Sequence, residues 1–232
     1  MDWSNFDESY VRLKNVLRDL IGNGRDENKL DIYGNYLTFG REVKIIVERI
    51  EKEIQGYMSS FREISEMAGR GEEPNEKLLD TFLNHHSLIR LDIKSLFIFT
   101  RIFIDTLAKI VRLRFGLCFG RKGEQLPPTM TQLLNNVKFL TLDPDFAEGF
   151  KNKMSWMTAF VETRVEIEHY LGNILRYTTT REGKFGFTLQ GSRSRKNPFL
   201  VTDKVESMTE YMEEILSKLS KVIQYTCNNF SS

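Results

Sequence analysis

The sequence predicts an all-α protein: an up-and-down bundle of about five or six helices with a small β-hairpin before the last helix. Three observations predict this fold. Apolar residues recur at helical spacing along most of the 232 residues. Two of the periodic segments are far longer than an ordinary helix. Only one short stretch, near the end of the chain, alternates apolar and polar residues as a strand does.

The first third of the chain predicts two helices. Residues 8–21 place apolar side chains on one face, and Gly22 and Gly24 follow as stop signals. A polar loop leads into IYGNYLTFG (residues 32–40), for which we expect a brief extended piece. A long helix is then predicted from Arg41 to Ala68, where further glycines end it.

The central segment, from Glu76 to Phe115, is apolar at nearly every second or third position, which indicates a helix surrounded by other helices. Its most apolar stretch, SLFIFTRIFIDTLAKIVRL, is interrupted by Arg101, Asp105 and Lys109. A membrane span needs about 20 nearly uninterrupted apolar residues. We therefore interpret the segment as a buried helix and expect no association with a membrane.

Two further helices are predicted after the stretch GRKGEQLPP, which has the length of a loop rather than of a tether between domains. Thr129 is placed to cap a short helix that ends near Leu140. Asp143 or Asp145 is placed to cap the next helix, which we expect to continue as far as Tyr177.

The end of the chain predicts the hairpin and the last helix. FGFTLQ (residues 185–190) alternates as a strand would, and we expect it to pair with FLV (residues 199–201). The last helix is predicted from Lys204 to Tyr225. We interpret residues 1–232 as a single domain in which the helices of residues 1–70 form an extension packed on the core.

Composition disfavours several classes of protein. Apolar residues make up 41% and charged residues 28% of the chain, as in an ordinary globular domain. The 33 basic and 32 acidic side chains give no global field that would attract nucleic acid, so such binding needs a local patch. Cys118 and Cys227 match no metal-ligand spacing, and His85 and His86 have no acidic partner at such spacing. With no signal-peptide pattern at the start, we expect a cytoplasmic protein without a metal or other cofactor.

A line of charged residues follows the central helix. Arg90, Lys94, Arg101, Asp105 and Arg112 recur at steps of four and seven residues, which places them on one face. Two interpretations remain open. The line faces solvent or a loop, with Arg101 and Asp105 as a surface pair worth about a few tenths of a kcal/mol. Alternatively, it lines a polar cleft or the seam of a dimer, because a helix this apolar is surrounded on most sides.

The helix predicted over residues 155–177 has one polar stripe: Glu162, Glu166, His169, Asn173 and Arg176. Arg164 falls on the apolar side, where an unpaired guanidinium would cost on the order of several kcal/mol. It therefore needs an anion. That anion is either a carboxylate such as Asp105, in a buried salt bridge, or a phosphate. His169 on a polar face is, by itself, typical of a solvated side chain.

The segment ETRVEIEHYL, in which Arg164 and His169 are spaced as R-x-x-x-x-H, resembles the signature of the HEPN superfamily of helical-bundle proteins. The preceding apolar stretch SLFIFTRIFIDTLAKI resembles the long helix that commonly accompanies this motif. The resemblance covers residues 87–225. It implies a metal-independent endoribonuclease that acts at the cleft of a homodimer, to which each subunit contributes Arg164 and His169.

The chemistry that this resemblance implies suits the residue types. Without a metal, the ribose 2′-hydroxyl attacks the neighbouring phosphate and leaves 2′,3′-cyclic phosphate and 5′-hydroxyl ends. His169 can move the protons, and Arg164 can stabilise the added charge. The supporting polar residues would be Arg101, Asp105, Glu166 and Asn173.

A basic and aromatic stretch, TREGKFGFTLQGSRSRKNP, follows the motif. Its basic residues are Arg181, Lys184, Arg193, Arg195 and Lys196, and Phe185 and Phe187 lie among them. Basic side chains suit a phosphate backbone, and aromatic rings suit unstacked bases. We therefore predict that this stretch binds RNA or a nucleotide. The alternative is a solvated loop without a ligand.

Val165 favours a second hypothesis. The residue after the arginine is usually polar in active members of the superfamily, and here it is apolar. The alternative is therefore a catalytically inactive HEPN-like module that binds a nucleotide or another protein. The resemblance also allows an antitoxin-like protein partner and a role in defence. An unrelated helical bundle is the remaining interpretation.

Overall fold

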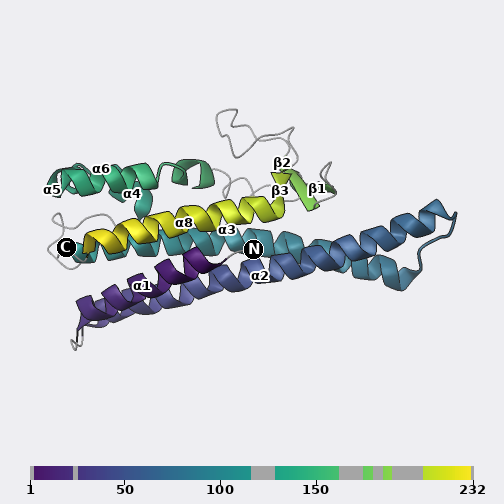
Figure 1. Cartoon of the computed structure of the whole chain (residues 1–232), viewed down its shortest axis with the longest axis horizontal. Helices are drawn as coiled ribbons and strands as arrows, with labels where there is room; N and C mark the ends of the chain where they lie inside the picture. Colours follow the sequence, from purple (N-terminus) through teal and green to yellow (C-terminus); the bar gives the residue numbers. More distant parts are fainter. Residues whose placement is uncertain are drawn as a thin grey trace. The chain divides into compact units, whose positions relative to one another are not determined.

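The computed structural model describes residues 3–22, 26–115, 129–161, 175–179, 185–189 and 206–230, and within them the protein is an all-α helical bundle with one small sheet (Figure 1). The helices are α1 (Ser4–Ile21), α2 (Glu27–Gly69), α3 (Glu76–Arg114), α4 (Met130–Leu134), α5 (Val137–Leu142), α6 (Pro144–Lys153) and α8 (Met208–Phe230). Residues 157–161 are helical as well. No helix in these ranges combines the length and apolar character needed to cross a membrane.

The chain divides into two compact units. Unit 1 consists of Met1–Arg41, Phe99–Val161 and Met212–Ser232, and unit 2 consists of Glu42–Ile98 and Glu162–Tyr211. Helices α2, α3 and α8 each contribute residues to both units. The single domain expected from the sequence stays a prediction.

The expectation of an extended piece at residues 32–40 is wrong, because these residues are part of α2. Ile32, Tyr36 and Val43 are buried at helical spacing and so continue the apolar face of the helix through the glycines. Gly40 is required by packing: a Cβ there would overlap the Tyr10 ring of α1. The residue that suggested a break therefore lets α1 and α2 approach each other closely.

A stack of aromatic rings forms the centre of unit 1. The Tyr10 and Tyr36 rings lie 4.9 Å apart between centroids, and Tyr36 lies 5.4 Å from Phe103 of α3. The Tyr36 hydroxyl donates to the backbone carbonyl of Tyr10 (3.0 Å), and the Tyr10 hydroxyl donates to that of Leu37 (2.9 Å). Burial raises the pKa of Tyr10 to about 12. Both hydroxyls are therefore satisfied structural donors.

The short helices of unit 1 confirm one predicted cap and modify another. Asp143 caps α6 by accepting a hydrogen bond from the amide of Phe146 (3.1 Å). Thr129 lies at the start of α4, but its side chain makes no capping bond. The predicted single helix to Leu140 is two, because the Asn136 side chain caps a new helix, α5.

The sheet has three antiparallel strands in the order β1-β2-β3: β1 (Leu175–Thr179), β2 (Phe185–Leu189) and β3 (Glu206–Ser207). The predicted strand at β2 is confirmed. Its expected partner FLV lies outside the described residues. Within them, β2 pairs with β1 and with β3. The single helix expected to run from Asp143 to Tyr177 is therefore wrong in two places. Helix α6 ends at Lys153, and helical structure resumes only at Met157 after a turn. At residues 175–179 the β-favouring sequence LRYTT pairs in register with β2.

The first and last helices differ from their predicted limits. Helix α1 begins at Ser4, four residues earlier than expected. Helix α8 begins at Met208 rather than Lys204, since Glu206 and Ser207 pair with β2. The Ser207 hydroxyl accepts from the amide of Glu210 (3.4 Å), as a capping residue does.

Candidate functional site

Most of the site predicted from the sequence lies outside the described residues. This holds for the catalytic pair Arg164 and His169, for the supporting residues Glu166 and Asn173, and for the RNA-binding residues Arg181, Lys184, Arg193, Arg195 and Lys196. The structure describes Phe185, whose ring was expected to suit an unstacked base. This expectation is wrong, because the ring is 4% exposed and packs against Tyr57. Of the predicted catalytic, supporting and basic site residues, the structure describes two, Arg101 and Asp105. Both belong to α3 and lie in unit 1.

Arg101 and Asp105 form the predicted ion pair. The Nε atom of Arg101 lies 3.1 Å from Oδ2 of Asp105, one helical turn further along α3. The side chains are 14% and 25% exposed, respectively. A pair covered to this degree is less screened by solvent than a surface pair. The pair is therefore partly covered rather than freely solvated, and the cleft or dimer seam expected along the charged line stays a prediction.

Asp105 also holds the start of α4. Its Oδ1 atom accepts a hydrogen bond from the backbone amide of Met130 (2.8 Å), the first residue of that helix. The first amides of a helix have no partner within the helix, and a carboxylate there satisfies one of them. Both oxygens of Asp105 are thus engaged. This carboxylate acts as the N-cap that Thr129 does not supply.

Arg101 joins three parts of unit 1. Besides Asp105, its guanidinium donates to the Thr131 hydroxyl of α4 (3.2 Å) and contacts the Met157 sulfur (3.8 Å). Met157 begins the helical residues 157–161, and it lies seven residues before Arg164 in the sequence. Arg101 therefore packs against the segment that leads directly into the motif. Arg90, Lys94 and Arg112, the other members of the charged line, are at least half-buried.

A second polar cluster, in unit 2, was missed by the sequence analysis. Asp92 of α3 is 1% exposed, and its Oδ1 lies 2.6 Å from Nη2 of Arg49 of α2. The other oxygen, Oδ2, is buried without a hydrogen-bond partner in the described structure. Burial raises the pKa of Asp92; Arg49 opposes this rise, and nearby Glu53 adds to it. The signal in the sequence was an aspartate between Leu91 and Ile93, on the side of the predicted helix away from Arg90 and Lys94.

The neighbouring pair in this cluster is Glu53 and His85. The Nδ1 atom of His85 lies 2.6 Å from Oε2 of Glu53, and both side chains are largely covered. The ring rests on Gly56, one turn beyond the point of contact, where a Cβ would overlap it. This acidic partner comes from another helix, so no local spacing could reveal it. Among the described residues, no group of histidine, cysteine, aspartate and glutamate could hold a metal ion.

A shallow groove lies in unit 1 between the start of α1 and the middle of α8. It has a volume of about 220 Å³ and is lined by Asn5, Phe6, Glu213, Leu216, Ser217, Ser220, Lys221 and Gln224. Its floor is fixed by the Ser220 hydroxyl, which donates to the Asn5 carbonyl (2.9 Å). None of the predicted site residues lines this groove.

Comparisons with protein-family models, with curated proteins and with solved structures find no match to this chain.

Proposed function

We propose that this protein is a metal-independent endoribonuclease of HEPN type that acts at the cleft of a homodimer. The observation that carries the proposal is the R-x-x-x-x-H spacing of Arg164 and His169 in ETRVEIEHYL. Two features support it. The chain is an all-α bundle, and helical residues 157–161 lead directly into the motif.

In the proposed reaction, the ribose 2′-hydroxyl attacks the adjacent phosphorus atom and the bond to the 5′-oxygen breaks. His169 transfers protons: neutral, it accepts the hydroxyl proton, and charged, it donates one to the leaving oxygen. Two copies of His169 meet in a homodimer and can divide these roles. Arg164 stabilises the additional negative charge on the phosphate oxygens. The products are a 2′,3′-cyclic phosphate and a 5′-hydroxyl.

Arg101 and Asp105 have a positioning role in this proposal. Asp105 neutralises Arg101 and fixes α4, and Arg101 contacts Met157 at the start of the motif-bearing segment. Because both oxygens of Asp105 already accept hydrogen bonds, it is poorly suited to remove a proton itself. Replacing Asp105 should therefore slow cleavage through misplacement of Arg164 rather than abolish the chemistry.

The test is RNA cleavage in the presence of EDTA. Purified protein is incubated with end-labelled single-stranded RNA, alongside Arg164→Ala and His169→Ala variants. The matched controls are Arg62→Ala and His86→Ala, which change the same residue types elsewhere in the chain. We expect cleavage by the native protein and both controls, loss in the two motif variants, and phosphatase-resistant 3′ ends. Absent cleavage, or cleavage that survives both motif substitutions, would refute the proposal.

We further propose that the basic stretch, residues 181–196, contacts the RNA backbone. Each phosphate contact to a single strand contributes about −0.7 to the slope of log K against log salt concentration. Replacing Arg193, Arg195 and Lys196 together by alanine should therefore reduce the slope by about 2 units. An unchanged slope in a binding titration over several salt concentrations would assign these residues to a solvated loop.

Val165 keeps the alternative function open. An apolar residue after the arginine suits a HEPN-like module that binds a nucleotide or a protein without cleaving RNA. That function predicts no cleavage, together with nucleotide binding that Arg164→Ala weakens. Homodimerisation is a further part of the proposal, and light scattering that shows a monomer would count against it. A cytoplasmic location, an antitoxin-like partner and a role in defence belong to the same proposal.

A further inference from the structure

The end of α2 and the start of α3 form a two-helix arm in unit 2, which we define as residues 61–83 (Figure 1). All of these residues are described. No residue from 61 to 88 is buried, although both helices contain many buried residues elsewhere. Two helices alone leave part of each apolar stripe exposed, and a third element is needed to cover it.

The exposed apolar residues of the arm follow a part of α2 that is covered by strand β2. Tyr57 of α2 contacts the Phe185 ring of β2, with 5.2 Å between the ring centroids. One turn further along α2, Phe61 is 41% exposed. On α3, Leu79 and Leu83 are 39% and 56% exposed and lie one turn apart. Strand β2 therefore covers α2 at Tyr57, whereas Phe61, Leu79 and Leu83 further along the arm are exposed.

Ring contacts join the two helices of the arm. Phe82 of α3 stacks on Tyr57 of α2, with 4.6 Å between centroids, and lies 6.5 Å from Phe61. These contacts hold the two helices together and leave Phe61, Leu79 and Leu83 on the outside. A face of this kind, prearranged on rigid helices, is typical of a surface that accepts an amphipathic helix.

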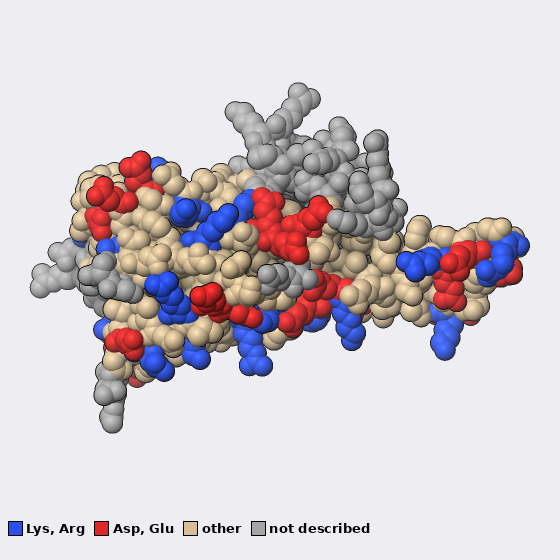
Figure 2. All heavy atoms as spheres, in the orientation of Figure 1, with Lys and Arg blue, Asp and Glu red and all other residues tan. Residues whose placement is uncertain are grey.

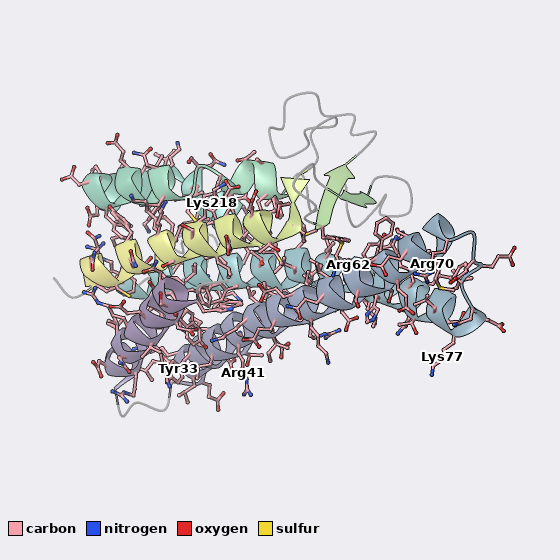
Figure 3. All side chains as sticks on the ribbon, turned by 45° about the vertical axis from the view of Figure 1, so that its right-hand side comes forward. Tyr33, Arg41, Arg62, Arg70, Lys77 and Lys218 are labelled. Carbon is pink, nitrogen blue, oxygen red and sulfur yellow. The ribbon has the colours of Figure 1, made fainter. Side chains whose placement is uncertain are left out.

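The arm has an excess of three negative charges. Its acidic residues are Glu63, Glu66, Glu72, Glu73, Glu76 and Asp80. Its basic residues are Arg62, Arg70 and Lys77, all labelled in Figure 3. Arg70 is already paired with Glu72 at 3.0 Å. Figure 2 shows that both signs of charge lie at the surface of the arm.

This charge indicates the kind of occupant. A second copy of the chain would bring the same excess of negative charge to the same stripe, and like charges in an interface are unfavourable. Glu76 lies three residues before Leu79, and Asp80 lies three residues before Leu83, so each acidic residue is about one turn from one of the two leucines. Complementarity therefore favours a partner with basic residues next to its apolar face.

We propose that the arm is a docking surface for a basic amphipathic helix of another protein. The apolar face of that helix packs on Phe61, Leu79 and Leu83, and its lysine or arginine residues lie against Glu76 and Asp80. The partner supplies the third helix that the arm lacks. This proposal is independent of ribonuclease activity, because it uses none of the motif residues.

The test uses a model peptide and the full chain. The probe is a fluorescent 18-residue amphipathic peptide with leucine on one face and lysine on the other, and a second peptide has glutamate in place of lysine. Binding is measured by fluorescence anisotropy for the native protein and for Leu79→Ser/Leu83→Ser. The matched control is Val11→Ser/Leu30→Ser, which removes two apolar side chains elsewhere in the chain that are 50% and 47% exposed. Circular dichroism confirms that each variant retains its helices.

We expect the double substitution in the arm to weaken binding of the lysine peptide by about tenfold or more, and the control to leave binding within about twofold. Glu76→Lys/Asp80→Lys should also weaken it, and the glutamate peptide should bind less tightly. Equal binding by the arm variant, or equal binding of the two peptides, would overturn the proposal. Self-association of the native chain that Leu79→Ser/Leu83→Ser abolishes would overturn it in favour of a second copy as the occupant.

Discussion

Gly56 lies in the interior of α2, where glycine normally weakens a helix by about 0.5–1 kcal/mol relative to alanine. Propensity alone therefore predicts that Gly56→Ala stabilises the protein. The structure predicts the opposite. A Cβ at this position would lie 2.5 Å from Nε2 and 2.8 Å from Nδ1 of His85. The ring must move away, and the 2.6 Å hydrogen bond between His85 and Glu53 is then lost.

The magnitude follows from two opposing contributions. Improved helix propensity contributes up to about 1 kcal/mol in favour of alanine. Losing a hydrogen bond to a charged group costs about 1.5–3 kcal/mol, since Glu53 is left mostly covered and without its partner. We therefore expect Gly56→Ala to lower the free energy of unfolding by about 0.5–2 kcal/mol. For a chain of this size, the melting temperature should fall by about 1–8 °C.

The assay is urea unfolding, followed by circular dichroism, of Gly56→Ala in two backgrounds. In the His85→Ala background no ring opposes the new methyl group, so Gly56→Ala should become stabilising by about 0.5–1 kcal/mol. The control is Gly34→Ala in the same helix, where a Cβ would meet no atom within 4 Å. This substitution should stabilise both the native protein and the His85→Ala variant. If Gly56→Ala stabilises the native protein as much as Gly34→Ala does, the reasoning is refuted.

Three further predictions concern Asp92, Asp105 and Cys227. Burial raises the pKa of Asp92, so its ionised form opposes folding and stability is lost as the pH rises through the folded-state pKa. The Asp92→Asn variant should therefore have an increasingly higher urea midpoint than the native protein as the pH rises from about 4 to about 7. A difference between the two midpoints that stays constant with pH would contradict this. Asp105→Ala removes the α4 cap and the partner of Arg101, and should cost about 2–4 kcal/mol in urea unfolding, whereas Asp105→Asn should cost about half as much. Burial raises the pKa of the Cys227 thiol to about 11. In a Cys118→Ser variant, a thiol reagent at about pH 8 should therefore label Cys227 only after the protein unfolds. Rapid labelling of the folded variant would be inconsistent with this burial.

Local patterns were sufficient for several elements. The central helix was predicted from Glu76 to Phe115 and is observed from Glu76 to Arg114, because its apolar run is long and has clear limits. Asp143 was recognised as a cap from its place before a helix. The end of the helix expected to reach Tyr177 was mispredicted, because the pattern of residues 175–179 suits a helix or a strand. The pairing with β2 decides in favour of the strand.

Glycines mark where local reasoning was insufficient. Gly40 was interpreted as part of a break, yet it lies inside α2 because the Tyr10 ring of another helix occupies the space of its missing side chain. Helix propensity describes the effect of a residue on the stability of its own helix. It carries no information about a side chain from another helix, such as Tyr10, that requires a small residue at that position.

By itself, the sequence determined the helical class of the protein, the limits of its central helix and the R-x-x-x-x-H spacing on which the proposed function rests. Only the tertiary structure decided which charges meet. Arg49 with Asp92 and Glu53 with His85 join residues 43 and 32 positions apart, and Asp105 caps a helix 25 positions away. The physical reason is that helical periodicity assigns a residue to a face, whereas the partner of a buried charge depends on which other helix packs on that face.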